Sequence, residues 1–153
     1  MRIEDILAPD LVLPALTATT KAGILDELAG AVAARHSEID QTRLVQALDE
    51  RERLNSTALG DGVAIPHGKL PGLRRVFAAF GRSADGVDFQ SLDGKPTYLF
   101  FLLVAPEESA GAHLKALARV SRLVKDDGFR ARLLHAPDAA ALYEAIRQED
   151  VRY

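Results

Sequence analysis

The spacing of apolar residues along the chain predicts helices near both of its ends. In several segments, apolar side chains recur every three or four positions, which places them on one face of an α-helix. Threonine, aspartate or proline near the start of these segments is typical of a helix N-terminus. The predicted helices are Thr20–Arg35, Asp40–Glu52, Ala110–Lys125, Gly128–His135 and a last helix that opens at Pro137 and carries Leu142 and Ile146.

The middle of the chain has the pattern of strands and turns instead. Residues Tyr98–Val104 are continuously apolar and aromatic, as expected of a central strand that is covered on both faces. Because strands stand among helices, we expect an α/β sandwich with helices on both faces of a central sheet. The remaining predictions are turn chemistry at Asn55–Gly62, strands at Val63–Ile65 (ended by Pro66) and Arg75–Phe80, a loop at Gly81–Gly86 and a short strand at Val87–Phe89.

Length, composition and charge exclude several classes of protein. The 153 residues contain no internal repeat or low-complexity linker, so a single domain over residues 1–153 is expected. A formal net charge of −3 argues against a nucleic-acid target. The longest apolar run, Tyr98–Ala105, is too short to cross a bilayer, and the first residues lack the layout of a signal peptide, so we expect a cytoplasmic protein without membrane insertion. The absence of cysteine excludes a thiolate nucleophile and a cysteine metal site.

Candidate chemistry centres on histidine, because the phosphate loop, the esterase elbow and the HExxH zinc motif are all absent. His36 and His135 lie near predicted helix ends and are interpreted as surface or capping residues. His67 follows a strand and precedes Gly68, whose missing side chain lets a ligand approach closely. His113 shares a helix face with apolar residues, where a buried core residue and a ligand-binding residue are both open interpretations.

Arg51 is the strongest anomaly among the charged residues. It falls on the apolar face of the second predicted helix, where a permanently charged guanidinium needs a partner. Two interpretations remain open: a salt bridge to Glu52 or Asp61, or an anion clamp beside His67. An arginine beside a histidine that is largely neutral at pH 7 suits phosphoryl transfer, with no metal or cofactor expected. A metal-dependent enzyme that uses His67 and His113 is a further hypothesis.

The segment RERLNSTALGDGVAIPHGKL, residues 51–70, closely resembles the active-site block of the enzyme IIA domains of the bacterial phosphotransferase system, in the mannitol/fructose/nitrogen class. The resemblance extends over nearly the whole chain and implies a mixed central sheet with helices on both faces. It implies that His67 accepts a phosphoryl group, that Arg51 lines the site, and that His113 lies close to His67. Ser56 and Thr57 match a polar loop that faces the site and would bind the phosphoryl group.

Within that class, the sequence pattern is most similar to that of the nitrogen-related enzyme IIA. The pattern reads Ser-Thr-x-x-Gly-x-Gly-Val-Ala-Ile-Pro-His-Gly-Lys-Leu. This implies a phosphotransferase component that receives phosphate from an HPr-like histidine phosphocarrier and acts on regulatory target proteins. The alternative is a sugar-specific (fructose/mannitol) enzyme IIA that passes phosphate to a separate IIB protein. Asp61 departs from the neutral residue that is expected at its position, and an acid there would pair with Arg51 or weaken phosphate binding.

Overall fold

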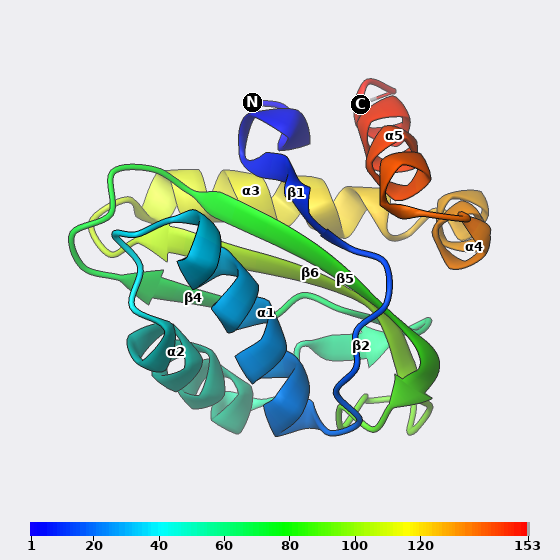
Figure 1. Cartoon of the computed structure of the whole chain (residues 1–153), viewed down its shortest axis with the longest axis horizontal. Coiled ribbons are helices and arrows are strands. Elements are labelled where there is room, and N and C mark those ends of the chain that lie inside the picture. The colour runs from blue at the N-terminus through cyan, green and yellow to red at the C-terminus, as the bar shows by residue number, and fades with distance from the viewer. Residues whose placement is uncertain (153) are drawn as a thin grey trace.

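The computed structural model describes residues 1–152 and shows a six-stranded β-sheet between two layers of helices (Figure 1). Helices α1 and α2 cover one face of the sheet, and α3 crosses the other face, where α4 and α5 complete the layer through contacts with β6 and β1. The predicted α/β fold class is therefore confirmed. In the described part of the chain, every helix is too short or too polar to cross a membrane. The elements are η1 (Ile3–Asp5), β1 (Leu7–Leu13), α1 (Lys21–Arg35), α2 (Gln41–Leu54), β2 (Ala58–Gly60), β3 (Val63–Ala64), β4 (His67–Leu70), β5 (Phe77–Val87), β6 (Thr97–Pro106), α3 (Ala110–Leu123), α4 (Asp127–His135) and α5 (Ala139–Asp150).

The predicted helices are all present, and capping side chains set the starts of most of them. At α1, α2, α4 and α5, the side chain before the first helical residue accepts a hydrogen bond from the backbone N–H three positions further on. This bond satisfies one of the donors that the first turn of a helix leaves without a partner. The capping residues are Thr20, Asp40, Asp126 and Asp138.

The sheet is mixed, and the way β3 and β4 share one neighbour positions the site. The strand order is β1-β5-β6-β3-β2, and β4 also pairs with β6 in the parallel sense that β3 does. The register is the same on both sides of Pro66, because Val63 lies beside Leu99 and His67 lies beside Leu103. Pro66 has no N–H to donate and so interrupts the ladder. The prediction that the strand ends there is therefore wrong in one respect: His67 is the first residue of the resumed strand.

Strand β5 is longer than predicted, because it continues through the segment expected to be a loop. The glycine at position 81 suggested a turn, but it is required by packing: a Cβ on Gly81 would lie 2.7 Å from the Leu16 side chain. The Leu16 N–H donates to the Arg82 carbonyl at 2.9 Å, so the chain before α1 crosses β5 at this point. The predicted short strand also differs, since Val87 ends β5 and Phe89 lies outside any strand.

Two edge strands, β1 and β2, were not predicted from the sequence pattern. Strand β1 reads Leu-Ala-Pro-Asp-Leu-Val-Leu, and its proline and aspartate break the apolar alternation. Edge strands tolerate proline, and the register with β5 shifts between Leu7 and Val12. Strand β2 forms a tight hairpin with β3 within the segment predicted as turn chemistry, so both descriptions apply to Ala58–Gly60.

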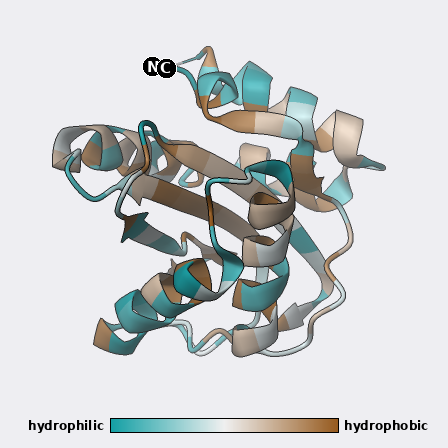
Figure 2. Ribbon diagram, turned by 60° about the vertical axis from the view of Figure 1, so that its left-hand side comes forward, coloured by the Kyte–Doolittle hydropathy of each residue, from teal (hydrophilic) through white to brown (hydrophobic). Residues whose placement is uncertain are grey.

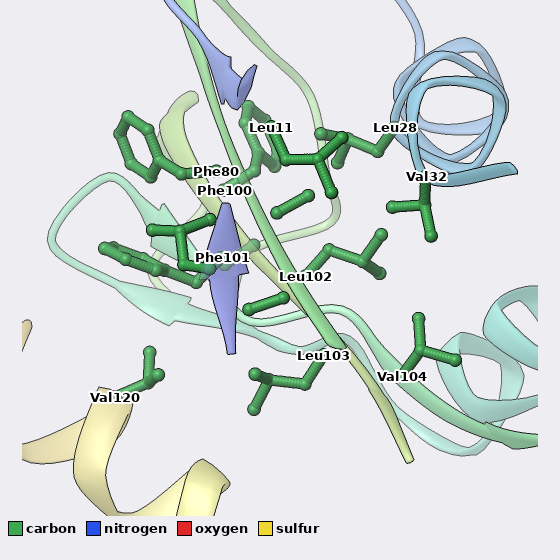
Figure 3. Packing of buried hydrophobic residues seen from close by; sticks show 14 of the residues in the cluster. Leu11, Leu28, Val32, Phe80, Phe100, Phe101, Leu102, Leu103, Val104 and Val120 are labelled. Atoms are coloured by element: carbon green, nitrogen blue, oxygen red, sulfur yellow. The ribbon is translucent and has the colours of Figure 1, made fainter. Parts of the chain in front are cut away.

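The core fills both interfaces between sheet and helices (Figure 3). Leu28 and Val32 of α1 lie on one side of the strands, and Val120 of α3 lies on the other. Residues 99–105 of β6 are buried, as predicted for a central strand covered on both faces. Apolar colour accordingly concentrates on the central strands in Figure 2, while polar colour marks the outer faces of the helices.

Two buried carboxylates tie the termini together, close to where both chain ends lie in Figure 1. Glu149 accepts from Arg132 Nη2 at 2.7 Å, and its side chain is fully buried. Asp150 accepts from the Ile3 backbone N–H at 2.7 Å and from Arg119 Nε at 2.5 Å. These contacts join η1, α3, α4 and α5 on the side of the molecule away from β4.

The two histidines predicted as surface or capping residues differ from each other. His36 is the C-cap of α1, and its N–H donates to the Val32 carbonyl. Its ring, however, packs against Phe77 with 4.0 Å between ring centroids, and only 10% of the side chain is exposed. His135 ends α4 as expected, exposed and with Nδ1 2.8 Å from the Ala131 carbonyl.

Candidate functional site

A cleft of about 630 Å³ lies where strand β4 meets helices α2 and α3. It brings together His67 of β4, Arg51 of α2 and His113 of α3, which are far apart in the sequence. In residues 1–152, no three or more His, Cys, Asp or Glu side chains group closely enough to hold a metal ion. The residues that line the cleft are Ala47, Glu50, Arg51, Leu54, His67, Gly68, Lys69, His113, Leu114 and Leu117.

The ring of His67 is held at both nitrogens. Its Nδ1 lies 2.8 Å from the Ile65 backbone carbonyl, which can only accept a hydrogen bond, so Nδ1 carries the proton. Its Nε2 lies 3.1 Å from Arg51 Nε, and because the guanidinium N–H can only donate, Nε2 presents a lone pair. The two contacts therefore select one neutral tautomer and direct its lone pair into the cleft.

Burial is the main influence on the ionisation of His67. Removal from water lowers the pKa of its imidazole, because it disfavours the charged form, and the positive charges of Arg51 and Lys69 lower the pKa further. The hydrogen bond to the Ile65 carbonyl raises the pKa, but it does not reverse the effect of burial. The pKa remains below its ordinary value, so His67 is mainly neutral at pH 7.

Arg51 owes its position to the end of α2. Its Nη1 donates to Asn55 twice, at 3.1 Å to the backbone carbonyl and at 2.9 Å to Oδ1, while Nε is directed to His67. Of the two interpretations of this arginine, the structure therefore favours the one beside His67. The Glu52 carboxylate contacts Lys21 and Thr57 instead, so the salt-bridge alternative is wrong for that residue.

Asp61 also lies away from Arg51. It occupies the tip of the β2–β3 hairpin with a positive φ of 59°, a conformation that aspartate tolerates better than most residues. Its carboxylate is exposed and lies 4.0 Å from Arg130 Nη2. The expectation that Asp61 pairs with Arg51 is thus wrong, and its side chain does not line the cleft.

Gly68 explains how α2 comes so close to β4. A Cβ at this position would lie 3.2 Å from the Ala47 Cβ and 3.5 Å from the Ala47 backbone carbon. Any side chain here would therefore push α2 away from the strand. The sequence suggested that this glycine admits a ligand, whereas its missing side chain is directed to the helix that carries Arg51.

His113 contributes a second imidazole to the same cleft. Its ring centroid lies 5.2 Å from that of His67. Burial lowers the pKa of His113, and charge on His67 and on Lys69 lowers it further. Its Nδ1 is buried without a hydrogen-bond partner among the described residues, which leaves Nε2 as the nitrogen available to a group in the cleft.

Ser56 and Thr57 are not brought into the cleft. The Ser56 hydroxyl donates to the Phe89 carbonyl at 2.7 Å and accepts from the Ala58 N–H. The Thr57 hydroxyl donates to Glu52, and its side chain is buried. Both hydroxyls are thus occupied in holding the loop between α2 and β2, and neither residue lines the cleft.

Several residues of the cleft were not predicted from the sequence, among them Lys69, Leu54 and Leu114. Lys69 lies two positions after His67 on β4, so the two side chains share one side of the strand. The strand that resumes after Pro66 would have revealed this pairing. Leu54 and Leu114 are 79% and 63% exposed at the rim, and such large exposed apolar side chains beside a polar site are typical of a docking surface.

Known proteins resemble this chain over nearly its whole length. A family model described as "Phosphoenolpyruvate-dependent sugar phosphotransferase system, EIIA 2" matches residues 5–149. The chain is 45% identical over 146 residues to a nitrogen regulatory protein of Bradyrhizobium diazoefficiens, covering 95% of each chain. It is 35% identical over 150 residues to the fructose-specific EIIABC component of Bacillus subtilis, covering 98% of this chain and 24% of that longer protein.

The fold is also similar to that of a solved structure. The crystal structure of the nitrogen regulatory protein IIA-Ntr from Neisseria meningitidis superposes with a TM-score of 0.88 at 30% identity, covering 94% of this chain and 98% of that one. Similarity of this kind in both sequence and fold extends over almost the whole chain. The chain therefore belongs to the EIIA 2 family of the phosphoenolpyruvate-dependent sugar phosphotransferase system.

Proposed function

We propose that this protein is a phosphocarrier that accepts a phosphoryl group on Nε2 of His67 from a histidine of an HPr-like carrier. The observation that carries the proposal is the orientation of the His67 ring. Its Nδ1–H is directed to the Ile65 carbonyl, and its Nε2 lone pair is directed into a cleft that contains Arg51. A neutral imidazole with a directed lone pair is a nucleophile that needs no base.

The transfer can be written without any proton movement. The lone pair of His67 Nε2 forms the new N–P bond, while the N–P bond in the carrier breaks and its electron pair returns to the carrier's imidazole. The His67 ring keeps its Nδ1 proton and becomes positively charged. The Ile65 carbonyl, 2.8 Å from Nδ1, then stabilises that charge through the same hydrogen bond.

Positive charge in the cleft stabilises the transferred group. Once Nε2 bonds to phosphorus, it no longer accepts from Arg51, so the Arg51 Nε–H turns to the phosphoryl oxygens while Nη1 stays on Asn55. Lys69 and His113 line the same space. Charge spreads over these oxygens in phosphoryl transfer, and preorganised donors of this kind lower the barrier.

The exposed leucines at the rim support docking of a protein donor. Leu54 and Leu114 flank the polar cleft, so a carrier with a matching apolar surface would exclude water from the transfer. Phosphorylation would then add about −1.5 to −2 charges beside this surface and change which proteins bind there. Similarity to a nitrogen regulatory protein supports this regulatory role in a nitrogen-type system.

Phosphorylation in vitro tests the proposal. The protein is incubated with phosphoenolpyruvate, enzyme I and an HPr-like carrier, and acid-labile phosphate is counted. We expect the wild type and His135→Ala to take up phosphate stoichiometrically, since His135 is exposed on α4 outside the cleft. His67→Ala should take up none. Stoichiometric uptake by His67→Ala would refute the assignment.

A sugar-specific enzyme IIA is the second candidate, favoured by the 35% identity to a fructose-specific component. In that case the phosphorylated protein should transfer its phosphate to a cysteine of a separate IIB protein. A nitrogen-type regulator should instead bind different partners as His67→Asp and as His67→Ala in pull-down experiments. Rapid transfer to IIB together with identical partner sets would favour the sugar-specific role.

A further inference from the structure

Glu52 is a buried carboxylate next to Arg51 in sequence, but it points away from the cleft. Its side chain is only 3% exposed. We infer that Glu52 is a positioning residue for His67: it holds the loop between α2 and β2, and this loop sets the orientation of the His67 ring. The inference rests on the proposed transfer at His67 and names a residue that supports it from outside the cleft.

The carboxylate of Glu52 accepts two hydrogen bonds from Thr57. Its Oε1 accepts from the Thr57 backbone N–H at 3.1 Å, and its Oε2 accepts from the Thr57 hydroxyl. Lys21 at the start of α1 balances the charge, with Nζ 3.0 Å from Oε1. A buried carboxylate with three donors is well satisfied, so its oxygens fix the position of Thr57 closely.

Thr57 is joined to His67 by two further hydrogen bonds. The Thr57 carbonyl accepts from the Ile65 N–H at 3.3 Å. The Ile65 carbonyl in turn accepts from His67 Nδ1 at 2.8 Å. Glu52 is therefore linked to the ring by a continuous series of hydrogen bonds, and the last of these bonds selects the tautomer that carries its lone pair on Nε2.

A second path leads to the other side of the same ring. Asn55 belongs to the loop that Glu52 holds, two residues before Thr57, and it accepts both hydrogen bonds from Nη1 of Arg51. Arg51 Nε then contacts His67 Nε2. A displacement of the loop would thus loosen both contacts of the His67 ring at once.

Lys21 gives this arrangement its rigidity. Its Nζ also donates to the Gln90 side chain at 3.2 Å and lies 4.8 Å from the ring centroid of Phe89. The Phe89 carbonyl accepts from the Ser56 hydroxyl, so the segment around residue 89 holds the same loop from the opposite side. Glu52 contacts both Lys21 and Thr57 and so joins α1 to the loop.

Three variants separate positioning from stability. Glu52→Ala removes both contacts to Thr57, while Glu52→Gln keeps an oxygen for the backbone N–H and an amide for the hydroxyl. Thr57→Val keeps the shape of the side chain and the backbone N–H bond to Glu52 and removes only the hydroxyl bond, so we expect it to fold even where Glu52→Ala does not. Glu149→Ala is the matched control, because Glu149 is equally buried and ion-paired but lies near the termini.

The first measurement is the nitrogen-15 NMR spectrum of the His67 ring in the unphosphorylated protein, which reports the tautomer without any transfer reaction. We expect the Nε2–H tautomer to become populated in Glu52→Ala and, to a smaller extent, in Thr57→Val. Glu52→Gln and Glu149→Ala should retain the Nδ1–H form. The second measurement is phosphoryl uptake, which should fall roughly tenfold in Glu52→Ala, the lower end of losses typical of residues that orient a functional histidine.

The outcomes are distinct from those for the proposed function. If the wild type takes up no phosphate, the proposed function fails, whereas the NMR comparison still tests the role of Glu52. If Thr57→Val and any folded Glu52→Ala keep the wild-type ring spectrum, the inference is overturned. It is also overturned if Glu149→Ala changes the His67 spectrum as much as Glu52→Ala does, because the effect would then follow from lost stability alone.

Discussion

Gly68 is a point of close approach between β4 and α2, and it allows a quantitative prediction. In Gly68→Ala the new Cβ would lie 3.2 Å from the Ala47 Cβ. Carbon atoms pack best at about 3.5–4.0 Å, so the helix and the strand must separate by about 0.5 Å. Overpacking of this kind destabilises a protein by about 1–3 kcal/mol.

The same displacement reaches the candidate site. Arg51 follows Ala47 by one helical turn on the same face of α2, so it retreats with the helix. The distance from Arg51 Nε to His67 Nε2 is 3.1 Å. A retreat of about 0.5 Å would lengthen it beyond the range of about 2.7–3.2 Å typical of a hydrogen bond. Since a 1 Å misplacement costs about 100-fold in rate, we expect a roughly tenfold loss of phosphoryl uptake.

The assay combines denaturant unfolding with phosphoryl uptake under conditions where each variant is folded. Ala47→Gly provides the compensating change, because it removes the nearer Cβ at a cost of about 1 kcal/mol in helix propensity. The double variant Gly68→Ala/Ala47→Gly should regain most of the uptake rate despite its lower stability. A Gly68→Ala protein that takes up phosphate at the wild-type rate, or a double variant as slow as Gly68→Ala, would refute the reasoning.

Three further predictions concern pH, the termini and the hairpin. Because burial lowers the pKa of His67 and His113, the unfolded chain binds more protons below about pH 6.5, so the free energy of unfolding should be full above that pH and fall below it in chemical denaturation. Asp150→Ala leaves Arg119 Nε and the Ile3 backbone N–H without their carboxylate acceptor, and it should cost about 3 kcal/mol in unfolding free energy while uptake by the folded protein is unchanged. Asp61→Asn, at an exposed positive-φ position that asparagine tolerates, should change stability by less than about 0.5 kcal/mol and leave phosphoryl uptake unaltered; a changed rate would show that the Asp61 charge reaches the cleft.

The parts of the fold that could be predicted are those that repeat a local pattern. The helices have a periodic apolar face, and β6 is a continuous apolar run, so each can be predicted from its own segment of the sequence. Strand β1 and the second half of β5 could not be predicted from a local pattern. Their proline, aspartate and glycine residues look like turn chemistry locally, but they serve an edge position and a close crossing by Leu16.

The sequence by itself determined which residue is the candidate phosphoryl acceptor. His67 lies in a short block whose composition is specific, and its histidine chemistry depends on the residue itself. The sequence also placed Arg51 on an apolar helix face, where it required a partner. Both inferences use information contained within one segment of the chain.

Only the tertiary structure decided which partner each of these residues has. The contact between Arg51 and His67 exists because Gly68 lets α2 approach β4, and the tautomer of His67 depends on the carbonyl of Ile65. The hydroxyl of Thr57, expected in the site, is instead bonded to Glu52. Hydrogen bonds are directional and act over about 3 Å, so they depend on how distant segments pack together, which no local pattern of residues specifies.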